Sequence, residues 1–546
     1  MTVLDRLALA AAFALPLAVA PLCAQAAVAS PFSTLHSANY QHYATLFAEQ
    51  EFEATKVHPP DAWPWLAANV PLFEASDKAF EETYYFRWYA FQKHIVTTKR
   101  GFVITEWLPR PETPDGFFGA LPDAAPFHLA EARWMRNPKV AADDANFWVS
   151  LDADPRKYST PIASAILGVS EATGDVGLAT TSLPALVANF NKWNDHFDPS
   201  VGLYWQIDTR DAMEKSIGGD GYRTPLNTYQ IADATAIAAI AARTGDTALH
   251  DQFQARAQTL RATMDAKLWN PGHQFYENLS PASDSPIRKQ KKFVDPGQPL
   301  SISGTRELIG YIPWQFSLPS AERNVAWKQL FDPQGFAGRY GPTTAERRSP
   351  RFRFESTDQC TWNGPSWPFA TTQTLLALAN LLNGPAQTYI GASDYLQLFR
   401  NYVLSQHLKL ASGRTINWID EDLDADTDEW IAKNMLMAKN KQVGRGNYYN
   451  HSGFADPLIT GLIGLRPQPP PMHPGDPDKL VLHPLLPAGA WSYFALDGLP
   501  YHGRMLTILY DATGQHYHRG AGLTVFADGK KLGSRRTLGP IEVPLS

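Results

Sequence analysis

Acidic side chains gather beside aromatic ones in one segment near the middle of the sequence. Residues 204–216 open on a Tyr-Trp pair that includes Trp205, and they contain Asp211 and Glu214 within four residues of one another. A carboxyl group near a base or a second acid can have a shifted pKa, which suits proton transfer. A solvated loop with local ion pairs is the alternative interpretation of the same residues.

A second acidic segment lies about two hundred residues further along the chain. Residues 417–426 contain Trp418 and five acids, among them Asp420 and Glu421. Like charges this close repel one another and can raise a carboxyl pKa. Alternating acids can also bind calcium, but this segment lacks the central glycine and the distal glutamate of an EF-hand loop.

A third segment carries tryptophans at the start of an apolar helix. Trp362 and Trp367 flank a Gly-Pro turn, with Asn363 between them. Sugar rings stack on aromatic faces, so we expect Trp205, Trp362 and Trp418 at the mouth or floor of a pocket. Trp367 could equally belong to the core.

Composition excludes several other classes of protein. The net charge is −6 and no long basic stretch occurs, which argues against nucleic acid as a partner. The sequence has no G-x-S-x-G elbow, phosphate-binding glycine motif or H-E-x-x-H motif. His516 and His518 could share one face of a strand, but surface histidines are the commoner explanation. We therefore expect no cofactor and no metal.

The first residues have the order of a secretory signal peptide. Arg6 precedes the apolar stretch 7–21, and Ala24-Gln25-Ala26 offers a cleavage site between small residues. We expect residues 1–26 to be removed and the protein to be periplasmic or secreted in a bacterium, without membrane insertion after cleavage. Cys23 raises the alternative of a lipoprotein. After cleavage only Cys360 remains, so no internal disulfide can form.

Apolar residues recur at helical spacing through most of the chain, which predicts a mainly α fold. The clearest case is residues 228–244, where small apolar residues recur every three or four positions. A proline-rich linker follows at 467–474, and short β-like runs with turn signals fill 475–546. The predicted helices are residues 78–98, 161–173, 182–193, 228–244, 247–268 and 366–382.

The three segments, in this order, resemble motifs of the six-hairpin glycosidases, which include trehalases, processing α-glucosidase I and bacterial mannosylglycerate hydrolases. Residues 212–216 match the family's acid motif, with Glu214 where the family has aspartate. Residues 362–367 match its W-R-G-P-x-W segment. Residues 421–428 match the segment that holds the family's base, and 450–458 match the helix start that follows it.

This resemblance implies a fold, a reaction and roles for particular residues. The fold is an (α/α)6 barrel over residues 27–466 with a small C-terminal β-domain. The reaction is hydrolysis of a glycosidic bond in a carbohydrate with inversion, which needs carboxyl groups about 6.5–9.5 Å apart. Glu214 would be the general acid and Glu421 the general base, with Asp211 and Asp420 as alternatives. The expected substrate contacts are Trp205, Arg223, Tyr229, Trp362, Asn363, Trp367 and Trp418.

Two other functions remain open from the sequence. A polysaccharide lyase or sugar epimerase can use a related helical toroid, and Tyr229, Tyr448, Tyr449 and His451 would then matter more than Glu421. A catalytically inactive periplasmic carbohydrate-binding protein is the non-enzymatic alternative. Activity that survives Glu421→Gln would favour the lyase, whereas sugar binding without turnover would favour the binding protein.

Overall fold

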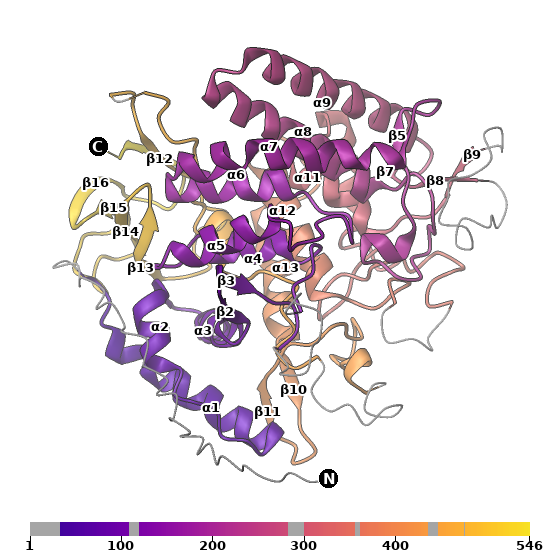
Figure 1. Ribbon diagram of the computed structural model, residues 1–546. Coiled ribbons are helices and arrows are strands. Elements are labelled where there is room, and N and C mark those ends of the chain that lie inside the picture. The colour runs from indigo at the N-terminus through magenta and orange to yellow at the C-terminus, as the bar shows by residue number, and fades with distance from the viewer. Residues whose placement is uncertain are drawn as a thin grey trace, which may run out of the picture.

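The computed structural model describes residues 33–108, 119–281, 300–354, 361–434, 446–473 and 475–545 (Figure 1). The expected signal peptide with Cys23, and also Cys360, lie outside these residues. Among the described residues, no helix is both long and apolar enough to cross a membrane.

The helices alternate along the chain between an inner and an outer position. Inner helices contact one another in the order α4, α6, α8, α11, α12 and α15, and α15 returns to contact α4, which closes a ring. Within the described residues this gives six inner elements, each preceded by an outer one, as an (α/α)6 barrel requires. The inner elements are α4 (Ala125–Ala132), α6 (Ile162–Thr173), α8 (Thr224–Thr244), α11 (Ile312–Gln315), α12 (Pro368–Leu382) and α15 (Ala455–Pro457), which continues as the π-helical turn η6 (Leu458–Leu462).

The outer elements pack on the backs of the inner ones, and α8 and α9 form the long pair at the top of Figure 1. Near the N-terminus, η1 (Ser37–Tyr40) and α2 (Trp63–Asn69) flank α1 and contact it. The outer elements are α1 (Gln41–Thr55), α3 (Lys78–Gln92), α5 (Lys139–Trp148), α7 (Val176–Lys192), α9 (Thr247–Leu268), η5 (Ala321–Gln329) and α13 (Ala392–Ser405).

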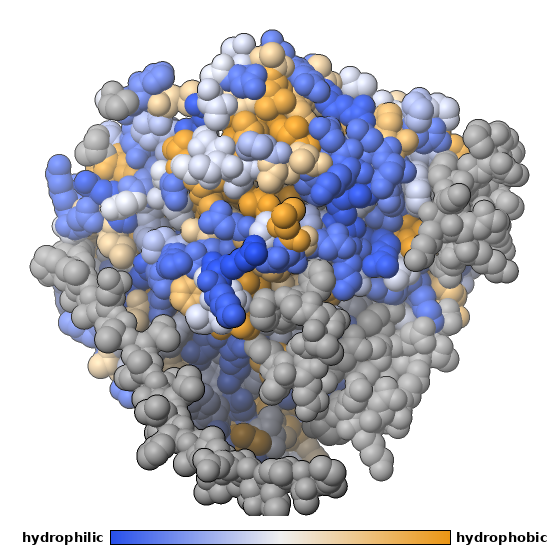
Figure 2. Space-filling model, viewed as in Figure 1, coloured by the Kyte–Doolittle hydropathy of each residue, from blue (hydrophilic) through white to orange (hydrophobic). Residues whose placement is uncertain are grey.

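Residue type explains which helices lie inside. Along α8 almost every side chain is buried, because alanines let the neighbouring helices α6, α7 and α9 approach closely. In α9 only one stripe is buried, at Phe253, Ala257, Leu260, Met264 and Leu268, and the other positions are largely polar. The surface mixes hydrophilic and hydrophobic residues accordingly (Figure 2).

Each predicted helix has a counterpart, but α8 begins four residues earlier than predicted and two others differ by six residues at one end. The predicted helix 78–98 ends at Gln92, and residues after it form a hairpin of β2 (Ile95–Thr98) and β3 (Gly101–Ile104), because β-branched residues replace the aromatic helix pattern. The helix predicted at 182–193 is α7, which begins earlier, at Val176. The Asp175 side chain caps it by accepting a hydrogen bond from the Leu178 N–H.

The small β-domain is built mainly from the C-terminal residues. An antiparallel sheet has the order β1-β13-β14-β15-β16, and its first strand comes from the other end of the chain. In this sheet β1 pairs with β13 and so joins the N-terminal region to the β-domain. The strands are β1 (Leu72–Ala75), β13 (Tyr493–Tyr501), β14 (Arg504–Asp511), β15 (Gly522–Ala527) and β16 (Lys530–Arg535), with β12 (Lys479–Leu482) and β17 (Ile541–Pro544) as a separate pair.

Short two-stranded hairpins lie in the loops of the barrel. They pair β4 (Phe197–Asp198) with β5 (Leu203–Tyr204), β6 (Trp269–Asn270) with β7 (Phe275–Tyr276), β8 (Leu279–Pro281) with β9 (Leu300–Ile302), and β10 (His407–Lys409) with β11 (Thr415–Asn417). The remaining short turns are η2 (Trp193–His196), η3 (Asp208–Asp211) and η4 (Leu308–Tyr311).

Candidate active site

The loops that lead into the inner helices meet at one end of the barrel. Because an outer helix precedes each inner one, the inner helices run in the same direction and their preceding loops lie together. The backbone joins the three predicted segments there. The Trp362 N–H donates to the Glu214 carbonyl at 2.9 Å, and Ser366 and Leu423 exchange two hydrogen bonds of 2.8 and 2.9 Å.

Glu214 lies on the loop before α8 and has a perturbed carboxyl group. Burial raises its pKa from 4.5 to about 8, and the charges of Asp123, Glu421 and Asp208 add to that effect. Glu214 is therefore mostly protonated at neutral pH. Because the charge of Glu421 contributes to the raised pKa of Glu214, the two predicted catalytic carboxyls are close enough to interact electrostatically.

The Glu214 loop, residues 207–223, has two non-glycine residues with positive φ and contains a buried ion pair. Ala212 and Lys215, on either side of Glu214, have φ of 58° and 59°, a conformation that costs energy for residues with a Cβ. The Arg223 Nε donates to Asp211 Oδ2 at 2.5 Å, and both side chains are fully buried. Such strain persists only where the surroundings enforce the conformation.

The side chains of Arg223 and Asp211 make their contacts within the Glu214 loop. Besides Asp211, Arg223 donates to the Ser216 hydroxyl at 3.0 Å and to the Gly219 carbonyl. Burial raises the pKa of Asp211, and the charge of Arg223 opposes that rise. The structure therefore places both side chains in contacts within the loop that carries Glu214. A substrate contact for Arg223 and the alternative acid role of Asp211 stay predictions.

Glu421 follows β11 and is 2 % exposed. Its backbone N–H donates to Asp420 Oδ1 at 2.8 Å, and the neighbouring Asp422 accepts from the Ala432 N–H at 3.1 Å. Burial raises the pKa of Asp420 to about 7, and it raises that of Asp422 as well. Both neighbours of Glu421 are thus less charged than free aspartates would be, which limits repulsion of its own carboxylate.

His451 lies beside the same segment. Burial holds its pKa well below 6.5, so the ring is neutral, and the Glu421 backbone is close enough to oppose that shift in part. The ring also sits against Trp367, Phe369 and Tyr449, with centroids 5.8, 5.7 and 4.3 Å away. His451 therefore brings the start of the matched segment 450–458 beside the Glu421 segment.

Two further acids belong to this end of the barrel, and sequence reasoning missed both. Glu106 and Asp123 precede α4 and are 2 % and 9 % exposed. Burial raises the pKa of Glu106, and the charges of Asp123, Glu421 and Glu214 raise it further. Burial also raises the pKa of Asp123 to about 7. Neither has another acid within five residues, so only the placement of Glu106 beside Trp107 could have drawn attention to it.

The predicted sugar platforms lie inside the protein. Trp205, Trp362 and Trp418 are 8 %, 2 % and 2 % exposed, so none forms an exposed rim. Trp362 stacks on Trp367 with centroids 4.9 Å apart, and Trp205 stacks on His196 at 4.3 Å. Their stacking partners account for the burial, and a place on the floor of the site remains a prediction.

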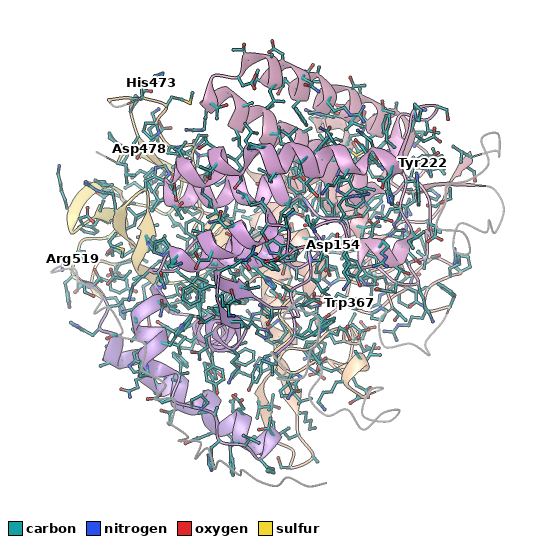
Figure 3. The ribbon with its side chains drawn as sticks, in the orientation of Figure 1. Asp154, Tyr222, Trp367, His473, Asp478 and Arg519 are labelled. Atoms are coloured by element: carbon teal, nitrogen blue, oxygen red, sulfur yellow. The ribbon has the colours of Figure 1, made fainter. Side chains whose placement is uncertain are left out.

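The other expected contacts are buried at the same end. Trp367, labelled in Figure 3, directly precedes α12. Its ring N–H donates to the Thr361 carbonyl at 2.9 Å. Asn363 is 1 % exposed. Tyr229, on the first turns of α8, accepts a 2.8 Å hydrogen bond from Gln373 on α12. The structure thus gathers these residues around the two loops, and their contact with substrate stays a prediction.

The distal acids of the second segment are used in ion pairs. Asp424 pairs with Arg353 at 2.6 Å and Asp426 with Arg347 at 2.8 Å. In the part of the chain that the structure describes, no group of three or more His, Cys, Asp or Glu side chains is arranged to hold a metal ion.

The closed ring of helix pairs, with acids on the loops that precede its inner helices, defines a six-hairpin glycosidase of the (α/α)6 type. The chain belongs to the mannosylglycerate hydrolase MGH1-like glycoside hydrolase family, whose domain matches residues 118–452. Residues 472–533 match the C-terminal domain of glycosyl hydrolase family 65. The resemblance and the mainly α fold with a small C-terminal β-domain are therefore confirmed.

Two solved structures are similar to this chain. A protein named "Sialidase" is 36 % identical, with a TM-score of 0.82, over 93 % of this chain and 45 % of its own. The present chain thus spans less than half the length of that relative. A GH63 mannosylglycerate hydrolase from Thermus thermophilus in complex with glucose is 13 % identical, with a TM-score of 0.48, over 69 % of this chain and 98 % of its own.

Proposed function

We propose that the protein hydrolyses a glycosidic bond with inversion, using Glu214 as general acid and Glu421 as general base. One observation carries the proposal. Glu214 has a pKa raised to about 8, and the charge of the buried Glu421 contributes to that rise. A protonated acid and a second carboxyl in one site are what this reaction needs.

Glu214 and Glu421 each carry out one proton transfer of the proposed reaction. Glu214 gives its proton to the glycosidic oxygen as the bond to the anomeric carbon breaks, and the leaving alcohol departs neutral. Glu421 accepts a proton from water, whose oxygen attacks the anomeric carbon from the opposite face. The product sugar therefore has the inverted configuration, and proton transfer through solvent returns both carboxyls to their starting states.

The charge of the site limits the substrate. Glu106, Asp123, Glu214 and Glu421 lie together, and the nearby Arg223 is occupied by the Glu214 loop. We therefore propose a neutral sugar at the cleaved bond. The ionised carboxylate that the general base Glu421 must carry would repel a uronate or a sialic acid, and Arg223 is already paired, which also disfavours the lyase alternative.

Export remains part of the proposal. Its support is the order of charged, apolar and small residues in the first 26 positions. Expression in a bacterial host, followed by N-terminal sequencing of the periplasmic protein, tests it. A mature chain that begins near residue 27 is expected, and one that retains Met1 would refute export.

A screen of aryl glycosides tests the hydrolase itself. The panel should pair α- and β-anomers of glucose, mannose, galactose and rhamnose, and include an aryl sialoside because of the relative named "Sialidase". We expect hydrolysis of at least one neutral glycoside, lost in Glu214→Gln and in Glu421→Gln. Glu171→Gln is the matched control, since Glu171 is a half-buried acid near the C-terminal end of α6, away from the site. Turnover that survives Glu421→Gln would contradict the assignment of the base.

A further inference from the structure

The small β-domain contacts the barrel through a turn that carries a histidine. His502 and Gly503 form the two-residue turn between β13 and β14, with φ of 47° and 72°. Positive φ at both positions is typical of a type I′ turn, which usually holds Asn, Asp or Gly. The turn lies against the C-terminal end of α6, since a Cβ on Gly174 would lie 3.0 Å from the His502 Cα. His502 therefore stands beside a helix end, at a position that the turn itself does not favour.

Both nitrogens of the His502 ring face oxygen acceptors. Nε2 lies 2.7 Å from the carbonyl of Glu171 in the last turn of α6, and Nδ1 lies 3.0 Å from each carboxyl oxygen of Asp478. Asp478, labelled in Figure 3, directly precedes β12. The side chain of His502 is 3 % exposed. The ring thus joins three segments, which are the end of α6, the start of β12 and the β13–β14 turn.

The acceptors determine the number of protons on the ring. A backbone carbonyl can only accept a hydrogen bond, so Nε2 must carry a proton. An ionised carboxylate also only accepts, so Nδ1 must carry one as well. A neutral ring would instead point the lone pair of Nδ1 at the two carboxyl oxygens of Asp478. An aspartic acid gives up its proton more readily than an imidazolium does, so the second proton stays on His502 and the ring is positively charged.

The end of α6 favours a positive charge at this place. The last carbonyls of a helix have no partner within it, and they carry the negative end of the helix dipole. Besides the Glu171 carbonyl, the Ala172 carbonyl accepts from the backbone N–H of His502 at 3.4 Å. The turn therefore supplies donors to two carbonyls at the end of α6, and a cationic ring is stabilised there.

Other titratable groups lie on the elements that pack around the ring. Tyr501 stacks on His502 with centroids 4.1 Å apart. Burial raises the pKa of the Glu171 carboxyl, and the charges of Arg133, Arg243 and His502 oppose that rise. Both arginines have other partners, since Arg133 forms a 2.7 Å ion pair with an aspartate of α15 and Arg243 donates to a carbonyl of the proline-rich linker at 2.7 Å. The carboxylate in direct contact with the ring is that of Asp478.

We propose that the His502–Asp478 pair makes the attachment of the β-domain to α6 depend on pH. In mild acid the ring holds two protons and donates to both acceptors. As the pH rises and Nδ1 loses its proton, the hydrogen bond to Asp478 is lost and a lone pair faces a carboxylate. The stabilising contribution is therefore complete in mild acid and is lost as the pH rises. The inference does not depend on the proposed hydrolysis, and the proposed export would expose this contact to the pH outside the cytoplasm.

Hydrogen exchange followed by mass spectrometry measures how often this contact opens. The whole protein is labelled at about pH 5.5 and at about pH 8.5, on either side of the ordinary titration range of histidine. Rates are corrected for the intrinsic pH dependence of amide exchange. The peptides that report on the contact cover residues 170–175 at the end of α6 and 499–505 around the turn.

Two variants and a control show whether the second proton matters. Asp478→Asn replaces the carboxylate by an amide that can donate to an unprotonated Nδ1, so the contact no longer needs that proton. His502→Gln removes the titrating ring and keeps a donor. The control is His250→Gln, because the partly buried His250 ring bonds a carbonyl, that of Ala238, through one nitrogen at 3.0 Å. Circular dichroism checks that each variant is folded.

Between the two pH values, we expect the protection of wild type and of His250→Gln to fall about tenfold. Protection in Asp478→Asn and His502→Gln should change by less than about twofold over the same range. A purely structural contact would instead lower the protection of Asp478→Asn and leave its pH dependence as in wild type. Wild type alone can refute the inference, since unchanged protection at the two pH values overturns it whatever the variants do.

NMR of the protein labelled with ¹⁵N-histidine counts the ring protons directly. A free histidine ring is mostly neutral at about pH 7, whereas both ring nitrogens of His502 should be protonated there. Comparison with His502→Gln identifies the signal. A neutral ring at this pH, or a fall in protection that is as large in both site variants as in wild type, would overturn the inference.

Discussion

The pH at which Glu214 loses its proton should set the upper limit of activity. At the ordinary pKa of 4.5, only about 0.3 % of a glutamic acid is protonated at pH 7, whereas about nine-tenths is protonated at a pKa of about 8. The difference is about 300-fold in the competent form, or about 3 kcal/mol of barrier. We therefore expect kcat/KM to be flat near neutral pH and to fall tenfold per pH unit above pH 8 or so.

The assay compares two leaving groups in wild type and in Glu214→Gln. A methyl or alkyl glycoside needs protonation of its leaving oxygen, whereas a 2,4-dinitrophenyl glycoside needs little. The variant should lose about 10²- to 10⁴-fold on the alkyl glycoside, far less on the dinitrophenyl glycoside, and the basic limb of the pH profile should disappear. Equal losses on both substrates, or a basic limb that remains in Glu214→Gln, would refute the assignment of the acid.

Three further predictions concern the base, the loop and stability. Glu421→Gln should abolish water attack, and azide should restore turnover with a glycosyl azide of inverted configuration as product, seen by NMR; no azide product would count against this role. Arg223→Met leaves Asp211 buried without its partner, so urea unfolding should show a loss of about 3–5 kcal/mol together with a lower kcat; an unchanged midpoint would exclude the loop-positioning role. The pKa of Asp233 is raised from 3.8 to about 8 by burial, so its stabilising contribution is complete below pH 4 and is lost as the pH rises to 8. Asp233→Asn should therefore flatten the fall in melting temperature between pH 5 and 8, and an identical slope in both proteins would contradict the buried, neutral carboxyl.

The sequence predicts the barrel well where local patterns carry the information. The alanine-rich pattern of residues 228–244 appears as inner helix α8, and the Gly-Pro turn between Trp362 and Trp367 leads into α12. Glu214 and Glu421 were found because acids cluster around them in sequence. Both residues lie at the same end of the barrel because outer and inner helices alternate, which brings every loop before an inner helix to that end.

The features that the sequence did not predict depend on contacts between distant segments. Glu106 and Asp123 each stand apart from other acids, and they join the site only because α4 packs against α15 when the ring closes. The strand β1 has four residues and no pattern of its own, yet it pairs with β13 more than four hundred residues later. Likewise, composition cannot tell a tryptophan that stacks on a sugar from Trp362, which stacks on Trp367.

The configuration of the first product tests the central claim most directly. An aryl glycoside that the protein cleaves is followed by ¹H NMR from the first minutes, before mutarotation mixes the anomers. The account predicts inversion, so an α-glycoside should release the β-sugar, and Glu214→Gln and Glu421→Gln should release almost none. Release of the sugar with its configuration retained would mean that Glu421 does not act as a base on water, and it would contradict the mechanism.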